Sequence, residues 1–227
     1  GDDVAPVLAA HIKAGGGRFR GIRHSCTWDP SPDVPNARCE PPEHLYQQEN
    51  FRQGFAQLAK HNMSFEGWCF HTKIKELTEL AQAFPDTTII LDHFGGPLGI
   101  GPYAGKRNDD FAQWQTDVTE LARCQNVVAK LGGINMELNG FGWHERDRPP
   151  GSEELVQGTR PYYDHAIEQF GVDRCMFESN FPVDMCSCSY NVLWNSFKHL
   201  TADYTAGEKA ALYHDTANRV YRLDDPV

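Results

Sequence analysis

Residues 87–93, Thr-Thr-Ile-Ile-Leu-Asp-His, form the stretch on which the fold depends. The first five are β-branched or aliphatic and uncharged, which is typical of a strand buried on both faces. A helical pattern precedes them, with Leu77, Leu80 and Ala81 on one face, and ends before Pro85. Because strands buried on both faces belong to parallel sheets covered by helices, this stretch predicts a βα unit.

The same alternation of strand and helix runs along the whole chain. The expected strands are 19–24, 65–71, 87–92, 126–131 and 175–179. The expected helices are 5–14, 51–61, 74–84, 111–124, 162–170, 190–200 and 206–221. Two long loops, 28–43 and 132–159, interrupt the alternation, and no linker divides the chain. The pattern predicts one α/β domain over residues 1–227, either an open doubly wound sheet or part of a (β/α)8 TIM-barrel-type fold.

Composition excludes several classes of protein. The chain has 227 residues, of which 40% are hydrophobic and 11% aromatic, so it is globular rather than disordered. Its formal net charge of −10 is the reverse of the basic excess of nucleic-acid-binding proteins. No apolar run approaches the roughly 20 residues of a membrane helix, and the first residues do not resemble a signal peptide. The seven scattered cysteines, Cys39 among them, predict reduced thiols in the cytoplasm.

Polar side chains stand at the end of every expected strand. They are Arg23 and His24, His71, Asp92 and His93, Lys130, and Glu178 with Asn180. Because the carboxyl ends of parallel strands meet at one edge of a sheet, these residues predict an active site built from several strands. Neutral imidazole is both a common metal ligand and a general base near pH 7, which singles out His71 and His93.

Each candidate also has a structural interpretation. His24 could be a hydrogen-bonded residue without a catalytic role, and Asp92 could hold the neighbouring histidine or cap the loop that follows it. Lys130 could extend from its apolar strand toward solvent, or it could contact a substrate carboxylate. Glu66 and Trp68 are expected on the strand face opposite the histidine at the strand end, where they would pack against helices.

Six motifs in register carry a resemblance to a known family. They are Phe-Arg-Gly-Ile-Arg (19–23), Gly-Trp-Cys-Phe-His (67–71), Leu-Asp-His-Phe-Gly-Gly-Pro (91–97), Asn-Val-Val-Ala-Lys-Leu (126–131), Arg-Cys-Met-Phe-Glu-Ser-Asn-Phe-Pro (174–182) and Asn-Arg-Val-Tyr (218–221). With these motifs the chain resembles the amidohydrolase-related family of TIM-barrel hydrolases, which includes sugar lactonases and 2-pyrone-4,6-dicarboxylate hydrolase. The resemblance implies a distorted barrel of which this chain holds the fourth to eighth βα units, without the first three strands.

The resemblance also bears on a cofactor. In metal-dependent members, a His-x-His pair in the first strand, histidines after the fifth and sixth strands and an Asp after the eighth surround a divalent cation, and zinc is the expected metal. The matching positions here are His71, His93 and Asn180. The chain contains no His-x-His, and an amide at position 180 is neither a carboxylate base nor an anionic ligand. Some lactone-hydrolysing relatives work without metal, so metal-independent hydrolysis is the second expectation.

The expected reaction is attack of an activated water on a lactone or related carbonyl, at a C–O or C–N bond of a small carboxylated substrate. His93 would activate the water, and Asn180 would position the water or the carbonyl. Arg23 would bind the substrate carboxylate, because a guanidinium offers a bidentate fork. His24 and Lys130 are the further candidates for substrate contacts.

Two alternatives stand beside this interpretation. A decarboxylase or hydratase on the same fold would carry the same motifs, and a truncated barrel without activity would serve as an interaction module. Five parallel strands do not close a barrel, so exposed strand edges would favour self-association, and a homo-oligomer is the alternative to a monomer. The expected partner is otherwise a small molecule, with neither nucleic acid nor membrane involved.

Overall fold

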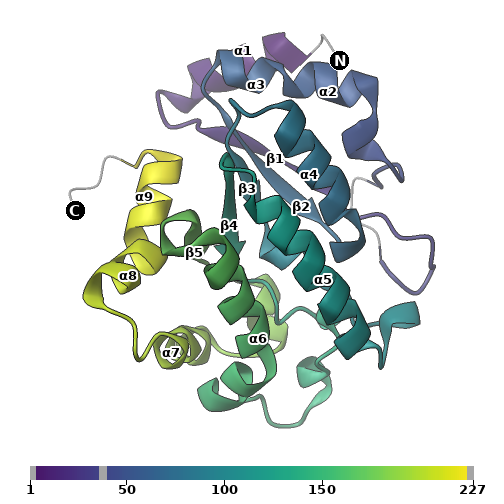
Figure 1. Cartoon of the computed structure of the whole chain (residues 1–227), viewed down its shortest axis with the longest axis vertical. Coiled ribbons are helices and arrows are strands. Elements are labelled where there is room, and N and C mark those ends of the chain that lie inside the picture. The colour runs from purple at the N-terminus through teal and green to yellow at the C-terminus, as the bar shows by residue number, and fades with distance from the viewer. Residues whose placement is uncertain (1–3, 36–39, 224–227) are drawn as a thin grey trace.

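A computed structural model describes residues 4–35 and 40–223 of the protein. A parallel sheet with the strand order β1-β2-β3-β4-β5 forms its centre (Figure 1). The strands are β1 (Gly21–Cys26), β2 (Ser64–Cys69), β3 (Ile89–Leu91), β4 (Val127–Leu131) and β5 (Cys175–Phe177). Each strand pairs with the next one along the chain, and helices connect them. The predicted α/β fold of successive βα units is therefore confirmed.

Helices flank both faces of this sheet, most of them on the outside. They are α1 (Val4–Gly15), α2 (Glu49–Phe55), α3 (Gln57–Lys60), α4 (Ile74–Ala83), α5 (Arg107–Ala122), α6 (Ser152–Phe170), α7 (Tyr190–Leu200), α8 (Ala206–Ala210) and α9 (Thr216–Tyr221). In Figure 1, α4, α5 and α6 lie beside one another on the viewed face of the sheet. None of the helices in the described part of the chain is long and apolar enough to cross a membrane.

Three helices differ from the prediction. The segment expected as one helix over 51–61 is divided into α2 and α3, and the segment 206–221 contains a π-helical turn, Ala211–Asp215, between α8 and α9. Helix α6 begins well before residue 162 and contains Pro161. Proline and glycine indicated a loop there, but the buried side chains of Leu155, Val156 and Thr159 hold this segment on the core as a helix.

The two faces of the sheet have different neighbours. Ile89 and Leu91 of β3 belong to the large core shared with the outer helices, whereas Ile90 between them points to the opposite, inner face. There Ile90, Val128 and Met176 pack against Ala217, Val220 and Tyr221 of α9. Helix α9 therefore closes the inner face at the amino ends of the strands. The next inward-facing residues along the strands are ionisable, and they form the candidate site.

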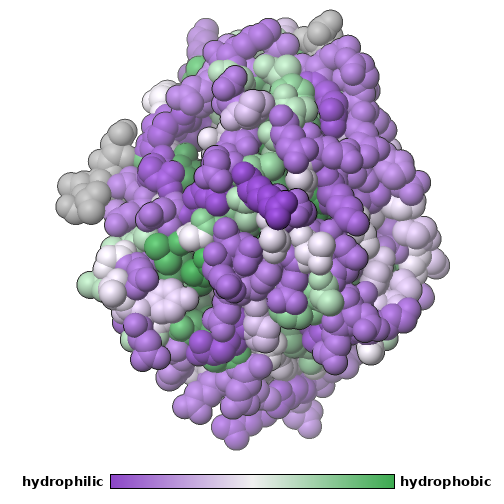
Figure 2. All heavy atoms as spheres, in the orientation of Figure 1, coloured by the Kyte–Doolittle hydropathy of each residue, from purple (hydrophilic) through white to green (hydrophobic). Residues whose placement is uncertain are grey.

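The described cysteines have free thiols, as the sequence predicts. They are Cys26, Cys69, Cys124, Cys175, Cys186 and Cys188. Cys39 lies outside the described residues. The surface of the viewed face is mostly hydrophilic, and its apolar side chains gather mainly beside the C-terminal helices (Figure 2).

Candidate active site

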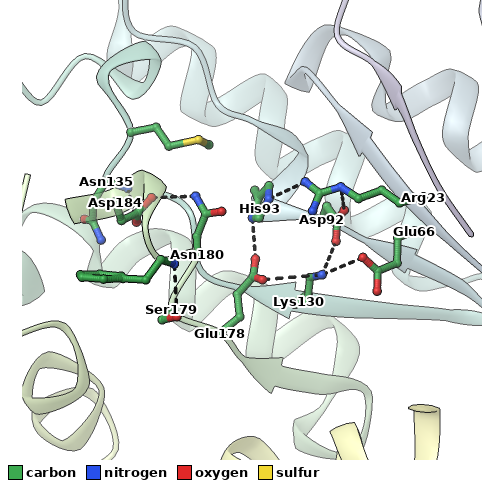
Figure 3. Close-up of polar contacts among 12 residues, drawn as sticks. Arg23, Glu66, Asp92, His93, Lys130, Asn135, Glu178, Ser179, Asn180 and Asp184 are labelled. Carbon is green, nitrogen blue, oxygen red and sulfur yellow. Dashed lines mark hydrogen bonds and ion pairs between the residues drawn. The ribbon is translucent and has the colours of Figure 1, made fainter. Parts of the chain in front are cut away.

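Five ionisable side chains meet on the inner face of the sheet (Figure 3). They are Arg23 of β1, Glu66 of β2, Asp92 after β3, Lys130 of β4 and Glu178 after β5. Successive residues of a strand point to opposite faces, so inward-facing positions on neighbouring parallel strands converge near the strand ends. His93 and Asn180, from the loops that follow β3 and β5, extend this group toward the carboxyl edge of the sheet.

Lys130 lies at the centre of the carboxylates. Its Nζ is 2.8 Å from Asp92 Oδ1, 2.9 Å from Glu66 Oε2 and 3.6 Å from Glu178 Oε2. Burial alone would lower the pKa of Lys130, but the surrounding carboxylates outweigh it and hold this pKa above its usual value. Lys130 is thus a permanent buried cation that holds three carboxylates together. Its position supports neither an extension to solvent nor a direct substrate contact.

Glu66 does meet a helix, α9, but on the inner face of the sheet, whereas the expectation that Trp68 packs against a helix is wrong. Glu66 Oε1 accepts a hydrogen bond of 2.6 Å from the Tyr221 hydroxyl, and the Trp68 ring stands edge-on to the His93 ring, with centroids 4.8 Å apart. Glu66 and Trp68 do share one face of β2, since Glu66 meets Lys130 and Trp68 meets His93. That face is the inner face of the sheet. Strand periodicity does not show which face is the inner one, and only the tertiary structure does.

His93 links two charged partners. Its Nδ1 lies 2.5 Å from Glu178 Oε1, and its Nε2 lies 2.9 Å from Arg23 Nη2. A guanidinium nitrogen can only donate, so the contact with Arg23 assigns the neutral tautomer in which Nε2 accepts and the proton is on Nδ1, beside Glu178. Burial raises the pKa of Glu178, but the hydrogen bond from His93 and the charge of Lys130 outweigh it, so this pKa lies below its usual value.

Asp92 holds Arg23 rather than His93. Asp92 Oδ2 is 3.0 Å from Arg23 Nε, and the Asp92 side chain is 0% exposed while that of Arg23 is 47% exposed. No cap hydrogen bond comes from the Asp92 side chain to the turn that follows. The carboxylate therefore anchors the base of the guanidinium, and the outer nitrogens of Arg23 remain at the edge of the site.

The backbone at the strand ends is unusual. His93, Phe94 and Asn180 have φ values of +51°, +58° and +52°, a left-handed conformation that costs roughly 1–2 kcal/mol for a residue other than glycine. The Trp114 indole holds this loop by donating a 2.7 Å hydrogen bond to the Phe94 carbonyl. Gly133 leaves space for the His93 ring, because a Cβ at position 133 would collide with it. Such strain is common at functional sites.

A pocket of about 280 Å³ opens beside His93. Arg23, Thr27, His93 and Asn180 supply its polar lining, and Trp68, Phe70 and Leu138 supply much of its apolar lining. A small cavity with apolar walls and a few convergent polar groups is typical of a site for a small molecule. The lining therefore suits a compact ligand with one anionic group.

Asn180 is held by a carboxylate that the sequence interpretation did not identify. Its Nδ2 donates to Asp184 Oδ1 at 2.7 Å, and Asp184 Oδ2 accepts from the Asn135 backbone N–H at 3.3 Å. Asp184 is completely buried, and burial raises its pKa to about 6 despite these hydrogen bonds. Asp184 belongs to a 3-10 turn after the strand-end motif, so strand parity gave no signal for it.

His71 and His24 lie outside this pocket. His71 Nδ1 accepts a 3.2 Å hydrogen bond from the Leu98 backbone N–H, and burial lowers its pKa, so it is a neutral structural imidazole. His24 is on the helix-facing side of β1, where its ring stands edge-on to Phe51 at 6.1 Å. These positions support neither a metal-ligand role for His71 nor a substrate contact by His24.

The described residues do not fit a divalent metal. Within residues 4–35 and 40–223, no three His, Cys, Asp or Glu side chains are grouped so that they could hold one ion. His93 Nε2 already accepts from Arg23, whose guanidinium takes the place of a cation beside the imidazole. Asn180 can offer only a neutral amide oxygen, because its NH2 group is held by Asp184.

The parallel βα sheet, with ionisable side chains converging beyond its strands around a small pocket, defines an enzyme site of the TIM-barrel hydrolase class. The chain belongs to the amidohydrolase family: the family model described as Amidohydrolase matches residues 1–223. This confirms the resemblance that the six motifs indicate.

Relatives of known sequence extend this assignment. The chain is 35% identical over 221 residues to the uncharacterized protein y4mH of Sinorhizobium fredii, covering 97% of this chain and 66% of that protein. It is 26% identical over 227 residues to an L-fucono-1,5-lactonase of Burkholderia multivorans, covering 98% of this chain and 70% of the lactonase. The chain thus spans about two thirds of the length of these relatives.

Solved structures share the fold. A crystal structure of an amidohydrolase from Burkholderia multivorans with bound zinc superposes with a TM-score of 0.76 at 24% identity, covering 96% of this chain and 69% of that one. At this identity the similarity concerns the fold, and it confirms the TIM-barrel-type architecture predicted from the βα pattern.

Proposed function

We propose that this protein hydrolyses lactones of small carboxylated molecules by attack of an activated water. The observation that carries the proposal is the His93 imidazole, whose Nδ1–H is held by Glu178 and whose Nε2 borders the pocket beside Arg23. A histidine oriented by a carboxylate is a general base suited to neutral pH. The similarity to an L-fucono-1,5-lactonase supports a lactone as the substrate class.

In the proposed reaction, His93 Nε2 takes a proton from water while the water oxygen bonds to the lactone carbonyl carbon. The resulting imidazolium is stabilised by the ionised Glu178 carboxylate at Nδ1. When the tetrahedral intermediate collapses, the ring C–O bond breaks and His93 returns its proton to the leaving alkoxide. The product is the ring-opened hydroxy acid, and the enzyme is regenerated in its starting protonation state.

The Nη2 group of Arg23 can donate a hydrogen bond either to His93 or to a substrate carboxylate. Without ligand, its Nη2 donates to His93 Nε2 and so occupies the lone pair that the reaction needs. A substrate carboxylate is a stronger acceptor than a neutral imidazole, so its binding would draw Nη2 away and free Nε2. Asp92 holds Nε throughout, so the guanidinium pivots rather than leaves. In this proposal Arg23 couples recognition of the carboxylate to exposure of the base.

The proposal also covers metal dependence, cellular location and self-association. The proposed reaction is the metal-independent one, since the described side chains around His93 are paired with Arg23, Glu178 and Asp184 rather than arranged around an ion. We also propose a cytoplasmic location, because the described thiols are free and mostly buried, as in a reducing compartment. Self-association stays part of the proposal and can be measured by light scattering.

The test is steady-state hydrolysis of a panel of 1,4- and 1,5-aldonolactones and carboxylated lactones, followed with a pH indicator. Saturable acid release with a preference for carboxylated substrates is expected. Release of CO2 from carboxylated substrates would instead establish a decarboxylase. Binding of the hydroxy acids by calorimetry without any turnover would establish a non-catalytic binding protein and overturn the proposal.

A further inference from the structure

Asp184 is a fully buried carboxylate that the mechanism above does not use. Its backbone is fixed by the turn after Pro182: its N–H donates to the Asn180 carbonyl at 3.2 Å, and its own carbonyl accepts from Ser187 and Cys188. Its side chain points back at the pocket residue Asn180 (Figure 3). Burying an ionised carboxylate costs free energy unless hydrogen bonds compensate it, and both Asp184 oxygens have donors.

The two carboxylate oxygens of Asp184 have separate donors from separate segments. Oδ1 accepts from Asn180 Nδ2 at 2.7 Å, and Oδ2 accepts from the Asn135 backbone N–H at 3.3 Å. Asn180 follows β5, and Asn135 belongs to the loop after β4. The carboxylate is thereby held in one orientation between two strand-end loops, and it can only accept when ionised.

We infer that Asp184 is a positioning residue that fixes the Asn180 amide with its Oδ1 facing the pocket. The inference rests on the proposed function. An asparagine amide has nearly the same shape after a 180° flip, so its own contour does not decide whether oxygen or nitrogen faces the ligand. The Asp184 carboxylate decides it, because only the NH2 group can be placed 2.7 Å from that oxygen. Figure 3 shows the Asn180 oxygen turned toward His93.

The orientation of the Asn180 amide determines which chemical groups can bind beside its Oδ1 atom. Oδ1 is an acceptor, so the group bound there must donate a hydrogen bond, as water or a hydroxyl does. A substrate carbonyl oxygen would be repelled. Asn180 therefore orients the attacking water beside His93 and does not polarise the carbonyl. Arg23, on the same pocket, supplies donors for the anionic end of the substrate.

Exchanging the two groups tests the inference. Asp184→Asn leaves one acceptor oxygen for two donors, so the Asn180 amide loses its fixed orientation, and kcat should fall about tenfold or more while KM changes less than about threefold. Asn180→Asp places two carboxylates against each other and should also lower kcat. The double variant N180D/D184N restores a carboxylate–amide pair in reverse, and its kcat should exceed that of either single variant.

A second measurement does not depend on turnover. The side-chain NH2 signals of Asn180 are assigned as those lost in Asn180→Ala, and they should shift in Asp184→Asn. If no lactone is hydrolysed, the proposed function fails while this shift still reports on the pairing. Unchanged Asn180 signals would overturn the inference, as would single-variant effects on kcat that simply add in the double variant. Circular dichroism melting of each variant separates these outcomes from unfolding.

Discussion

Glu178 Oε1 lies 2.5 Å from His93 Nδ1, and this contact orients the only histidine in the described pocket lining. Glu178 comes from the end of β5, and His93 follows β3, so the pair spans the sheet across β4. Lys130 of β4 lies between these strands and holds the second Glu178 oxygen at 3.6 Å. The imidazole is therefore oriented by a carboxylate whose pKa is held low by His93 itself and by the buried Lys130 cation.

Replacing Glu178 should impair catalysis without removing the base. In Glu178→Gln the amide oxygen can still accept from Nδ1–H, but it no longer stabilises the imidazolium, so we expect kcat to fall by about 10²-fold. Steady-state kinetics on the best lactone measure this. The matched control is Glu168→Gln, an exposed glutamate of α6, which should retain wild-type kcat. Equal rates for both variants would contradict the role of the pair.

Replacing His93 should have a comparable or larger effect. His93→Asn removes the proposed base, and kcat should fall about 100-fold or more with the fold retained. His24→Asn is the matched control, because His24 lies on the helix-facing side of β1 and should be dispensable for turnover. If His93→Asn hydrolyses lactones at the wild-type rate, His93 does not activate the water.

Lys130→Met tests the buried ionic layer. It leaves Glu66, Asp92 and Glu178 facing one another without their cation, and breaking a buried charge cluster typically costs about 3–5 kcal/mol of unfolding free energy. The deficit should shrink at lower pH, because the unpaired carboxylates can then be neutralised by protonation. Urea denaturation at pH 7 and pH 5 measures both effects. A variant as stable as wild type at pH 7 would show that the layer does not depend on Lys130.

Asp184 should give the protein a specific pH dependence of stability. Its pKa is raised to about 6 in the folded state, above the ordinary value of an aspartate, so the folded state binds more protons between about pH 4 and pH 6. The stabilising contribution of Asp184 is therefore present at the acid end and is lost as pH rises through this window, by about 3 kcal/mol. The measured quantity is the difference in unfolding free energy between wild type and Asp184→Asn across pH 4–7. A flat difference would contradict the raised pKa.

Metal content should respond to position 180. The wild-type protein should retain little zinc, whereas Asn180→Asp should retain more, because a carboxylate is a far better ligand than an amide. Elemental analysis after zinc loading and identical dialysis compares the two proteins. Stoichiometric zinc in the wild-type protein would show that the existing side chains suffice as ligands.

The strand ends show how far prediction from sequence reaches. Period-2 alternation correctly placed Glu66 and Trp68 on one face of their strand, but it could not say that this face lies inside the sheet. His71 and His24 are as suitable chemically as His93, but only the tertiary structure shows that neither lines the pocket. Asp184 gave no signal, because its proximity to Asn180 arises from a turn rather than from a periodic element.

The sequence by itself determined the βα alternation, the parallel sheet, the membership in the amidohydrolase family, and the gathering of Arg23, His93, Lys130 and Asn180 near the strand ends. These properties follow from local patterns, because hydrophobic periodicity and turn residues act over a few neighbouring positions. The alternation left a doubly wound sheet and a barrel both open, and the sequential strand order β1-β2-β3-β4-β5 of the structure agrees with the barrel.

Only the tertiary structure decided which side chains touch. The pairing of Glu178 with His93, the anchoring of Arg23 by Asp92 and the orientation of Asn180 by Asp184 each join residues from different segments or through a turn. Such contacts depend on the curvature of the sheet and on φ values near +50° at the strand ends, and neither is encoded by a repeating pattern. A hydrogen bond is made or lost over less than an ångström, a distance that periodicity along one chain cannot resolve.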